Sequence, residues 1–173
     1  MAQTLPRKAL IAISSFNGPI YPAGHKTGLF LTEALHPYEV FAAAGFDVDL
    51  ASETGTFGLD FNSLQPPFLS GSSKAIYHNS DHPFMVKLNS QLKKASDLKK
   101  EAYGVFFASA GHAALYDYPT AKGLQAIAAD VWDRGGNRRY CVPWTGNLAG
   151  NHRLQDRQVD RRRQDGDRIY DRR

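Results

Sequence analysis

The carboxylate of Glu33 stands where a protein can use it for acid/base chemistry. Residues 27–45 read TGLFLTEALHPYEVFAAAG, with apolar side chains at helical spacing and Gly45 as a natural stop. Glu33 falls in the first turns of this predicted helix. A carboxylate there can take and return a proton, and it can equally serve as a favourable partner for the positive helix N-terminus. The spacing by itself leaves both interpretations open.

Two histidines are the next candidates. Gly111-His112 directly follows the apolar run YGVFFA, where α/β enzymes often present backbone N–H groups to an oxyanion. Gly111 can also simply permit the turn out of the strand, and the sequence favours neither the oxyanion interpretation nor the turn interpretation. His36 and Glu39 are three residues apart, but a metal site needs more ligands than this. We therefore expect His36 to be satisfied by structural contacts, and we expect no metal and no cofactor.

The basic residues gather in one part of the chain. Residues 1–136 hold 11 Lys plus Arg against 12 Asp plus Glu, whereas residues 137–173 hold 10 Arg against 5 Asp. The net charge of +4 therefore belongs to the C-terminal part and does not mark a basic domain. Arg161-Arg162-Arg163 can contact phosphates, but five Asp residues dilute the charge and no aromatic platform accompanies it. We do not expect nucleic acid as a partner.

The elements that must position these residues alternate between strands and helices. The runs ALIAIS (residues 9–14), FDVDLA (46–51) and YGVFFA (103–108) predict strands, the second as an outer strand of the sheet. Further helices are expected over 83–94 and 120–134, and the first helix is expected to be interrupted or bent at Pro37. Residues 56–82 are rich in Gly, Pro, Ser and Asn and predict a long ordered excursion.

This alternation indicates an α/β fold with a parallel sheet. Such sheets bind ligands outside the carboxyl ends of their strands, so we expect the site among the loops after Ser14, Ser52 and Ala108. The segment from Asn137 fits nothing in this pattern, because Arg138 and Arg139 would place two charges where a buried strand is required. We expect residues 137–173 to form a disordered tail after a domain of residues 1–136.

The compartment is inferred from what the sequence lacks. One cysteine, Cys141, allows no disulfide within the chain. The N-terminal residues show no apolar signal region, and no run approaches the length of a membrane span. We expect a protein of the cytoplasm, with the nucleus as a second location, and no membrane partner.

The ordered segments together resemble a known family. SSFNGPIYPAGHKTGLFLTEALHPYEVFAAAGFDVDLASETGTFG is followed by VFFASAGHAALYDYP and a helix that ends in RGG. Over about residues 7–136 the chain is similar to the fungal heat-shock glyoxalase III branch of the ThiJ/PfpI superfamily. The combination of TGLFLTEALHP with SAGHAALYDYP is specific to that resemblance.

The resemblance implies a flavodoxin-like (class I glutamine amidotransferase-like) sandwich, incomplete at the C-terminus in this chain. It implies a glutathione-independent glyoxalase, or D-lactate dehydratase, that converts methylglyoxal to D-lactate without a cofactor. It assigns Glu33 the catalytic acid/base role and leaves Gly111 and His112 to shape the pocket for a small dicarbonyl substrate. A homodimer is the implied assembly. The alternative is a non-catalytic, chaperone-like stress protein of the same fold.

The resemblance ends before the family nucleophile, a cysteine in a Val-Cys-His-Gly-Pro motif shortly after the Gly-Gly pair. This chain instead reads NRRYCVPWTGNLAG. Cys141 falls one position before the expected nucleophile, which would turn its side chain to the other face of a strand. It also lacks the following His and Gly. We therefore expect this chain to be inactive.

The reading frame of the gene offers a test of why the sequence after Gly136 departs from the family motif. Residues 140–145 must be encoded by TAY TGY GTN CCN TGG ACN, and reading one base later permits Val-Cys-His-Gly-Pro, with Gly forced by the Trp codon. We predict that the nucleotide sequence of codons 135–145 encodes Cys-His-Gly in that shifted frame. A stop codon there, or any other reading, contradicts the expectation that residues 137–173 are an out-of-frame translation.

Overall fold

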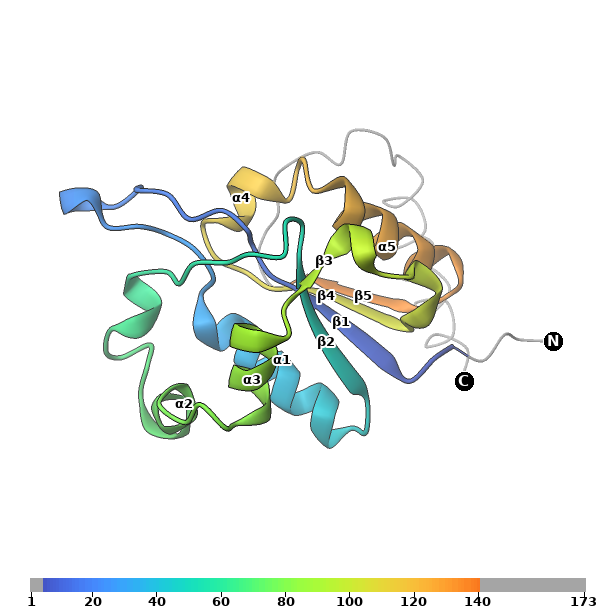
Figure 1. Ribbon diagram of the computed structural model, residues 1–173, viewed down its shortest axis with the longest axis horizontal. Helices are drawn as coiled ribbons and strands as arrows, with labels where there is room; N and C mark the ends of the chain where they lie inside the picture. Colours follow the sequence, from blue (N-terminus) through green and yellow to red (C-terminus); the bar gives the residue numbers. More distant parts are fainter. Residues whose placement is uncertain (1–4, 141–173) are drawn as a thin grey trace, which may run out of the picture.

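The computed structural model describes residues 5–140, which form one parallel sheet with helices on both faces (Figure 1). The strands are β1 (Lys8–Ala12), β2 (Asp47–Ser52), β3 (Lys93–Lys94), β4 (Val105–Ala108) and β5 (Asn137–Tyr140). The α-helices are α1 (Leu31–Ala43), α2 (Gly71–Tyr77), α3 (Pro83–Ser90), α4 (Ala114–Asp117) and α5 (Lys122–Asp133). Short 3-10 turns are η1 (Pro22–Gly24), η2 (Asn62–Leu64), η3 (Ala95–Asp97) and η4 (Lys100–Ala102).

The order of the strands fixes where a ligand can bind. The sheet runs β3-β2-β1-β4-β5 and every pair is parallel. From β1 the chain first moves outward through β2 and then resumes on the other side of β1 with β4. Ligands of doubly wound sheets bind at the carboxyl edge of this switch point, which here lies between β1 and β4. The predicted flavodoxin-like α/β class is confirmed.

The central strand β1 is buried on both faces, which explains its unbroken apolar sequence. Ala9 and Ile11 pack into a core that contains Leu31 and Leu35 of α1 and Leu88 of α3. Alternate residues of the same strand point into a second core, formed with α5, that contains the side chains Leu10, Ala12, Phe106, Leu124, Ile127 and Val131. Helices α1 and α3 cover one face of the sheet and α5 covers the other (Figure 1).

One carboxylate is buried within the sheet. Asp49 of β2 is 4% exposed, and its Oδ2 accepts hydrogen bonds from Lys93 Nζ at 2.7 Å and from Tyr103 Oη at 2.9 Å. Lys8 Nζ lies 3.2 Å away and also contacts Asp47. Burial acts to raise the pKa of Asp49, but the hydrogen bonds from these three side chains lower it below its ordinary value.

Two expectations about the elements are wrong, and a third is wrong in part. Strand β2 is not an outer strand, because β3 pairs with it on the side away from β1. Helix α1 is not interrupted at Pro37, and a bend at Pro37 stays a prediction. Residues 137–140, which we expected to begin a disordered tail, form β5 beside β4. The sheet therefore extends past Gly136, because backbone pairing with β4 overrides the polar composition of this short segment.

The rest of the predicted disordered, out-of-frame tail, residues 141–173, lies outside the described residues. Among residues 5–140, none of the helices has the length and apolar character required to cross a bilayer.

Replacing Asp49 with Asn should lower the free energy of unfolding by about 2 kcal/mol at pH 7, because two lysines lose their charged acceptor. Since folding lowers the pKa of Asp49, its contribution is present above the ordinary pKa of 3.8 and is lost as the pH falls through the lower folded value. Urea unfolding of wild type and variant should therefore differ at pH 7 and converge in acid.

The exposed Asp81 supplies the matched control. Asp81→Asn should change the free energy of unfolding by less than about 0.5 kcal/mol. Equal losses in the two variants would contradict a stabilising role for the buried carboxylate.

Candidate active site

The three residues singled out by the sequence line one pocket at the carboxyl edge of the sheet. Helix α1 begins just after Leu29, whose backbone bridges to Leu59, and so brings Glu33 to the loop that follows β4. A pocket of about 230 Å³ is lined there by Phe30, Glu33, Ala110, Gly111, His112 and Leu115. The structure thus brings Glu33, Gly111 and His112 together, while their catalytic and binding roles stay predictions.

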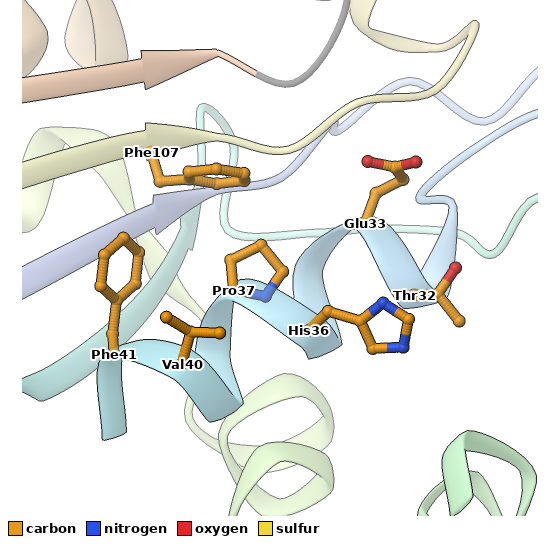
Figure 2. A pocket seen from close by; sticks show the side chains of 7 residues that line it. All are labelled: Thr32, Glu33, His36, Pro37, Val40, Phe41 and Phe107. Atoms are coloured by element: carbon orange, nitrogen blue, oxygen red, sulfur yellow. The ribbon is translucent and has the colours of Figure 1, made fainter. Parts of the chain in front are cut away.

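The Glu33 carboxylate has no hydrogen-bond partner among residues 5–140, although it is half-buried. Its side chain points toward the strand ends and away from those of Thr32 and His36 (Figure 2). The other buried or half-buried carboxylates among residues 5–140 all accept hydrogen bonds from protein groups; they are Asp49, Glu53, Asp60, Asp117 and Asp130. An unpaired carboxylate facing a pocket is available to accept a proton from a bound molecule.

Glu33 also lines a second pocket, on the side of α1 that faces β4. This pocket measures about 650 Å³ and is lined by Thr32, Glu33, His36, Pro37, Val40, Phe41 and Phe107. Its inner wall is aromatic, with the rings of Phe41 and Phe107 edge to face at 6.1 Å. Figure 2 shows Glu33 at one end of this row of apolar side chains. The carboxylate therefore lies at the junction of a small pocket and a larger apolar one.

Gly111 has a backbone conformation that disfavours other residues. Its φ is +125°, and a Cβ built on it would lie 3.3 Å from the Gly28 carbonyl oxygen and 3.4 Å from Phe30 Cβ. The loop after β4 therefore packs closely against the segment that leads into α1. This geometry supports the turn interpretation of Gly111, and the oxyanion interpretation stays a prediction.

His36 and Glu39 do not form a ligand site. His36 Nε2 lies 3.1 Å from Ser73 Oγ of α2, which agrees with the expectation of a satisfied structural histidine. In the part of the chain that the structure describes, no three His, Cys, Asp or Glu side chains are grouped closely enough to hold a metal ion.

Sequence reasoning missed a hydrogen-bonded clamp that lies beside the site. Asp117 of α4 accepts hydrogen bonds from Ser14 Oγ at 2.9 Å and from the Ser15 backbone N–H at 2.6 Å. Burial raises the pKa of Asp117, although these hydrogen bonds act to lower it. The clamp ties the loop after β1 to the helix after β4, and no local pattern could have revealed it because its partners are about a hundred residues apart.

The loops after Ser14 and Ser52 contribute no lining residue to the two Glu33 pockets, contrary to expectation. In the loop after Ser52, the Glu53 carboxylate accepts hydrogen bonds from the Gly123 N–H at 2.9 Å and the Leu124 N–H at 3.0 Å. These donors belong to the first turn of α5, where backbone N–H groups lack helical partners. Glu53 therefore caps a helix and contributes nothing to the Glu33 pocket.

The end of β5 determines where the chain continues. Tyr140 pairs with Ala108, so both strands end at the same level of the sheet. Ala108 leads into the Gly111 loop, and Tyr140 leads to Cys141. Cys141 itself and the Arg161-Arg162-Arg163 stretch lie outside the described residues.

Comparison with known proteins gives consistent results, although no family model matches the chain. The chain is 54% identical over 129 residues to glyoxalase 3 of Candida albicans, a match that covers 75% of this chain and 54% of that protein. It is 45% identical over 131 residues to a glutathione-independent glyoxalase of Saccharomyces cerevisiae, covering 76% and 55% respectively. The chain thus spans about half the length of these curated relatives.

Solved structures agree with this similarity to glyoxalases. The crystal structure of glyoxalase III from Candida albicans superposes with a TM-score of 0.75 at 42% identity, covering 90% of this chain and 74% of that one. The Rapid Encystment Protein of Francisella tularensis matches with a TM-score of 0.62 at 19% identity, covering 77% and 57%. The second likeness supports the fold alone.

Substituting Ala for Gly111 should lower the free energy of unfolding by about 1–3 kcal/mol, because the new residue is held at a disfavoured φ. It should also shift the amide resonances of residues 30–34, since the added Cβ presses on Gly28 and Phe30. Urea unfolding and ¹⁵N spectra measure the two effects.

Gly24→Ala is the matched control, because Gly24 also has a positive φ, +76°, but nothing lies within 4 Å of its added Cβ. It should lose stability without moving the resonances of residues 30–34. A Gly111 variant as stable as wild type would contradict the backbone argument.

Proposed function

The chain belongs to the glutathione-independent glyoxalase family, and on that premise we propose that it is the Glu33-bearing part of a glyoxalase III that acts on small dicarbonyls such as methylglyoxal. The observation that carries the proposal is the half-buried, unpaired Glu33 carboxylate in a pocket shared with Gly111 and His112. The pocket volume of about 230 Å³ suits a small substrate better than a large one.

The proposed chemistry needs a thiol and the transfer of two protons. A thiolate adds to the aldehyde carbon of methylglyoxal and forms a hemithioacetal. Glu33 then removes the proton from that carbon and returns it to the neighbouring carbonyl carbon, while the hydroxyl proton of the hemithioacetal passes to the former ketone oxygen. The product is a thioester of lactate. Water hydrolyses the thioester, releases D-lactate and restores the thiol, so the overall reaction consumes only water.

This chain has no cysteine within the Val-Cys-His-Gly-Pro motif that carries the nucleophilic thiol in the family. Its one cysteine, Cys141, directly follows β5 and is succeeded by Val142 and Pro143 in place of His and Gly. We therefore propose that the 173-residue chain does not turn over methylglyoxal, and that activity requires the shifted reading frame.

A second candidate function rests on exposed apolar side chains. Val40 is 65% exposed, and Phe68, Leu115 and Tyr116 are each more than half exposed. Apolar side chains open to solvent can hold unfolded clients. They favour a chaperone-like stress protein without catalysis, and they are equally compatible with the proposed homodimer. For either function we propose the cytoplasm and the nucleus as locations.

We predict that the purified 173-residue chain forms no D-lactate from methylglyoxal without glutathione, whereas the frame-restored protein does. In the frame-restored protein Glu33→Gln should reduce turnover by about 10²- to 10⁴-fold, because the proton can no longer be transferred. Glu39→Gln, an exposed carboxylate on the same helix, is the matched control and should leave turnover unchanged.

Three outcomes would contradict this assignment. D-lactate formation by the 173-residue chain that is abolished by Cys141→Ser would show that the thiol present is sufficient. Equal effects of the Glu33 and Glu39 variants would remove Glu33 from the reaction. Suppression of client aggregation by a frame-restored protein that forms no D-lactate would establish the second candidate function.

A further inference from the structure

A hairpin that projects from the sheet brings an aromatic side chain onto His112. The hairpin spans residues 18–27, closed by an antiparallel bridge between Pro19 and Lys26, and extends beyond the rest of the structure (Figure 1, blue). It carries Tyr21, whose ring lies edge to face with that of His112 at 5.9 Å. The Tyr21 hydroxyl is 3.1 Å from His112 Nδ1.

The Tyr21 hydroxyl contacts the fully buried carboxylate of Asp60, and both oxygens of this carboxylate accept hydrogen bonds. Asp60 is 0% exposed. Its Oδ2 accepts from Tyr21 Oη and from Thr27 Oγ1, both at 2.8 Å. Its Oδ1 accepts from the backbone N–H groups of Asn62 at 2.8 Å and Ser63 at 3.1 Å. Four donors therefore converge on the two oxygens of this carboxylate.

The direction of this chain of hydrogen bonds determines the protonation of His112. Tyr21 has one hydroxyl hydrogen, and the bond to Asp60 uses it. Its oxygen can therefore only accept from the imidazole, so Nδ1 carries the hydrogen of neutral His112. Burial and the Asp60 hydrogen bond raise the pKa of Tyr21, which keeps the phenol protonated. Nε2 is then left with a lone pair, and no group in residues 5–140 occupies it.

We infer that Tyr21 and Asp60 are positioning residues that hold His112 in the Nδ1-protonated form, so that its Nε2 accepts a hydrogen bond in the pocket opposite Glu33. The observation behind this location is that Glu33 and His112 line the same pocket, and the Nδ1 atom is already engaged by Tyr21. In that form His112 recognises a hydroxyl of the reacting molecule and cannot donate to a carbonyl. The hydroxyl of the hemithioacetal fits this acceptor, a point that rests on the proposed function.

The tautomer of His112 can be measured without any activity. Long-range ¹H–¹⁵N spectra of the 173-residue chain at about pH 9, where imidazoles are neutral, should show Nδ1 protonated, with the signals assigned by their loss in His112→Gln. Tyr21→Phe keeps the ring contact and removes the acceptor, so Nε2-protonated His112 should become the main species.

Asp60→Asn tests the direction of the chain of hydrogen bonds while Tyr21 stays in place. The Asn oxygen still accepts from the Asn62 and Ser63 N–H groups, a turn that Asn forms well. Its amide N–H now donates to Tyr21, which then turns its hydrogen toward His112 Nδ1. The tautomer should therefore reverse to Nε2-protonated, as in Tyr21→Phe.

Tyr116→Phe is the matched control, because Tyr116 stacks on Phe16 at 4.4 Å and its hydroxyl makes no hydrogen bond within residues 5–140. It should leave the His112 tautomer unchanged. Wild-type His112 protonated at Nε2, or the same tautomer in wild type, Tyr21→Phe and Asp60→Asn, would overturn the inference.

Turnover of the frame-restored protein supplies the second readout. Tyr21→Phe and Asp60→Asn should lower kcat on the order of ten-fold or more, with little change in KM, because Nε2-protonated His112 no longer accepts a hydrogen bond at Nε2. A frame-restored protein without D-lactate formation would overturn the proposed function alone, and the tautomer measurements would still decide the inference. Full turnover in variants with a reversed tautomer would overturn the role of Nε2.

Discussion

The parallel pairing of β1 with β4 is the constraint on which the site depends. It places the carboxyl ends of two strands that are far apart in sequence at the same edge, in register from Ala9 with Val105 to Ala12 with Ala108. The strand order reverses direction between them, which makes this edge of the sheet the place where doubly wound sheets bind ligands. Asp117 of α4 holds the loop after β1 by accepting hydrogen bonds from the Ser14 side chain and the Ser15 backbone. Without that register Gly111 and His112 would not meet the first turn of α1.

The carboxylates of this chain differ in how their charge is satisfied, and the difference separates structural groups from the candidate reactive one. Asp49 is neutralised by two lysines, Glu53 is bound by two N–H groups of a helix, and Asp60 accepts from four donors. Burying any of these three carboxylates without such partners would cost folding free energy. Glu33 has none within residues 5–140, and it faces open space. A group left unpaired at the edge of two pockets is free to exchange a proton with a bound molecule.

The larger pocket places Glu33 beside apolar side chains as well. Its wall includes Pro37, Val40, Phe41 and Phe107. The smaller pocket instead combines Glu33 with Gly111 and His112. Glu33 therefore joins a small pocket that contains a polar side chain to a larger apolar one.

Much of the fold could be predicted from local sequence, because burial on both faces, helical spacing and turn residues are encoded within a few positions. The apolar run of β1, the helix that carries Glu33 and the α5 helix are of this kind, and so is the parallel sheet that their alternation requires. The charge distribution likewise excluded a basic domain. Position in the chain also singled out Glu33 and Gly111-His112 as site candidates, and the resemblance of TGLFLTEALHP to glyoxalase III then assigned Glu33 the acid/base role, which stays a prediction.

Only the tertiary structure decided which polar groups meet. Asp49 in FDVDLA suggests a solvent-facing position, but Lys93 and Tyr103 arrive from more than forty residues away and allow its burial. Asp117 with Ser14, and Asp60 with Tyr21 and His112, are pairings of the same kind. Pairing with β4 also made a strand of residues 137–140, against their composition. Hydrogen bonds between distant segments depend on the packing of the whole sheet, and so no local pattern carries them.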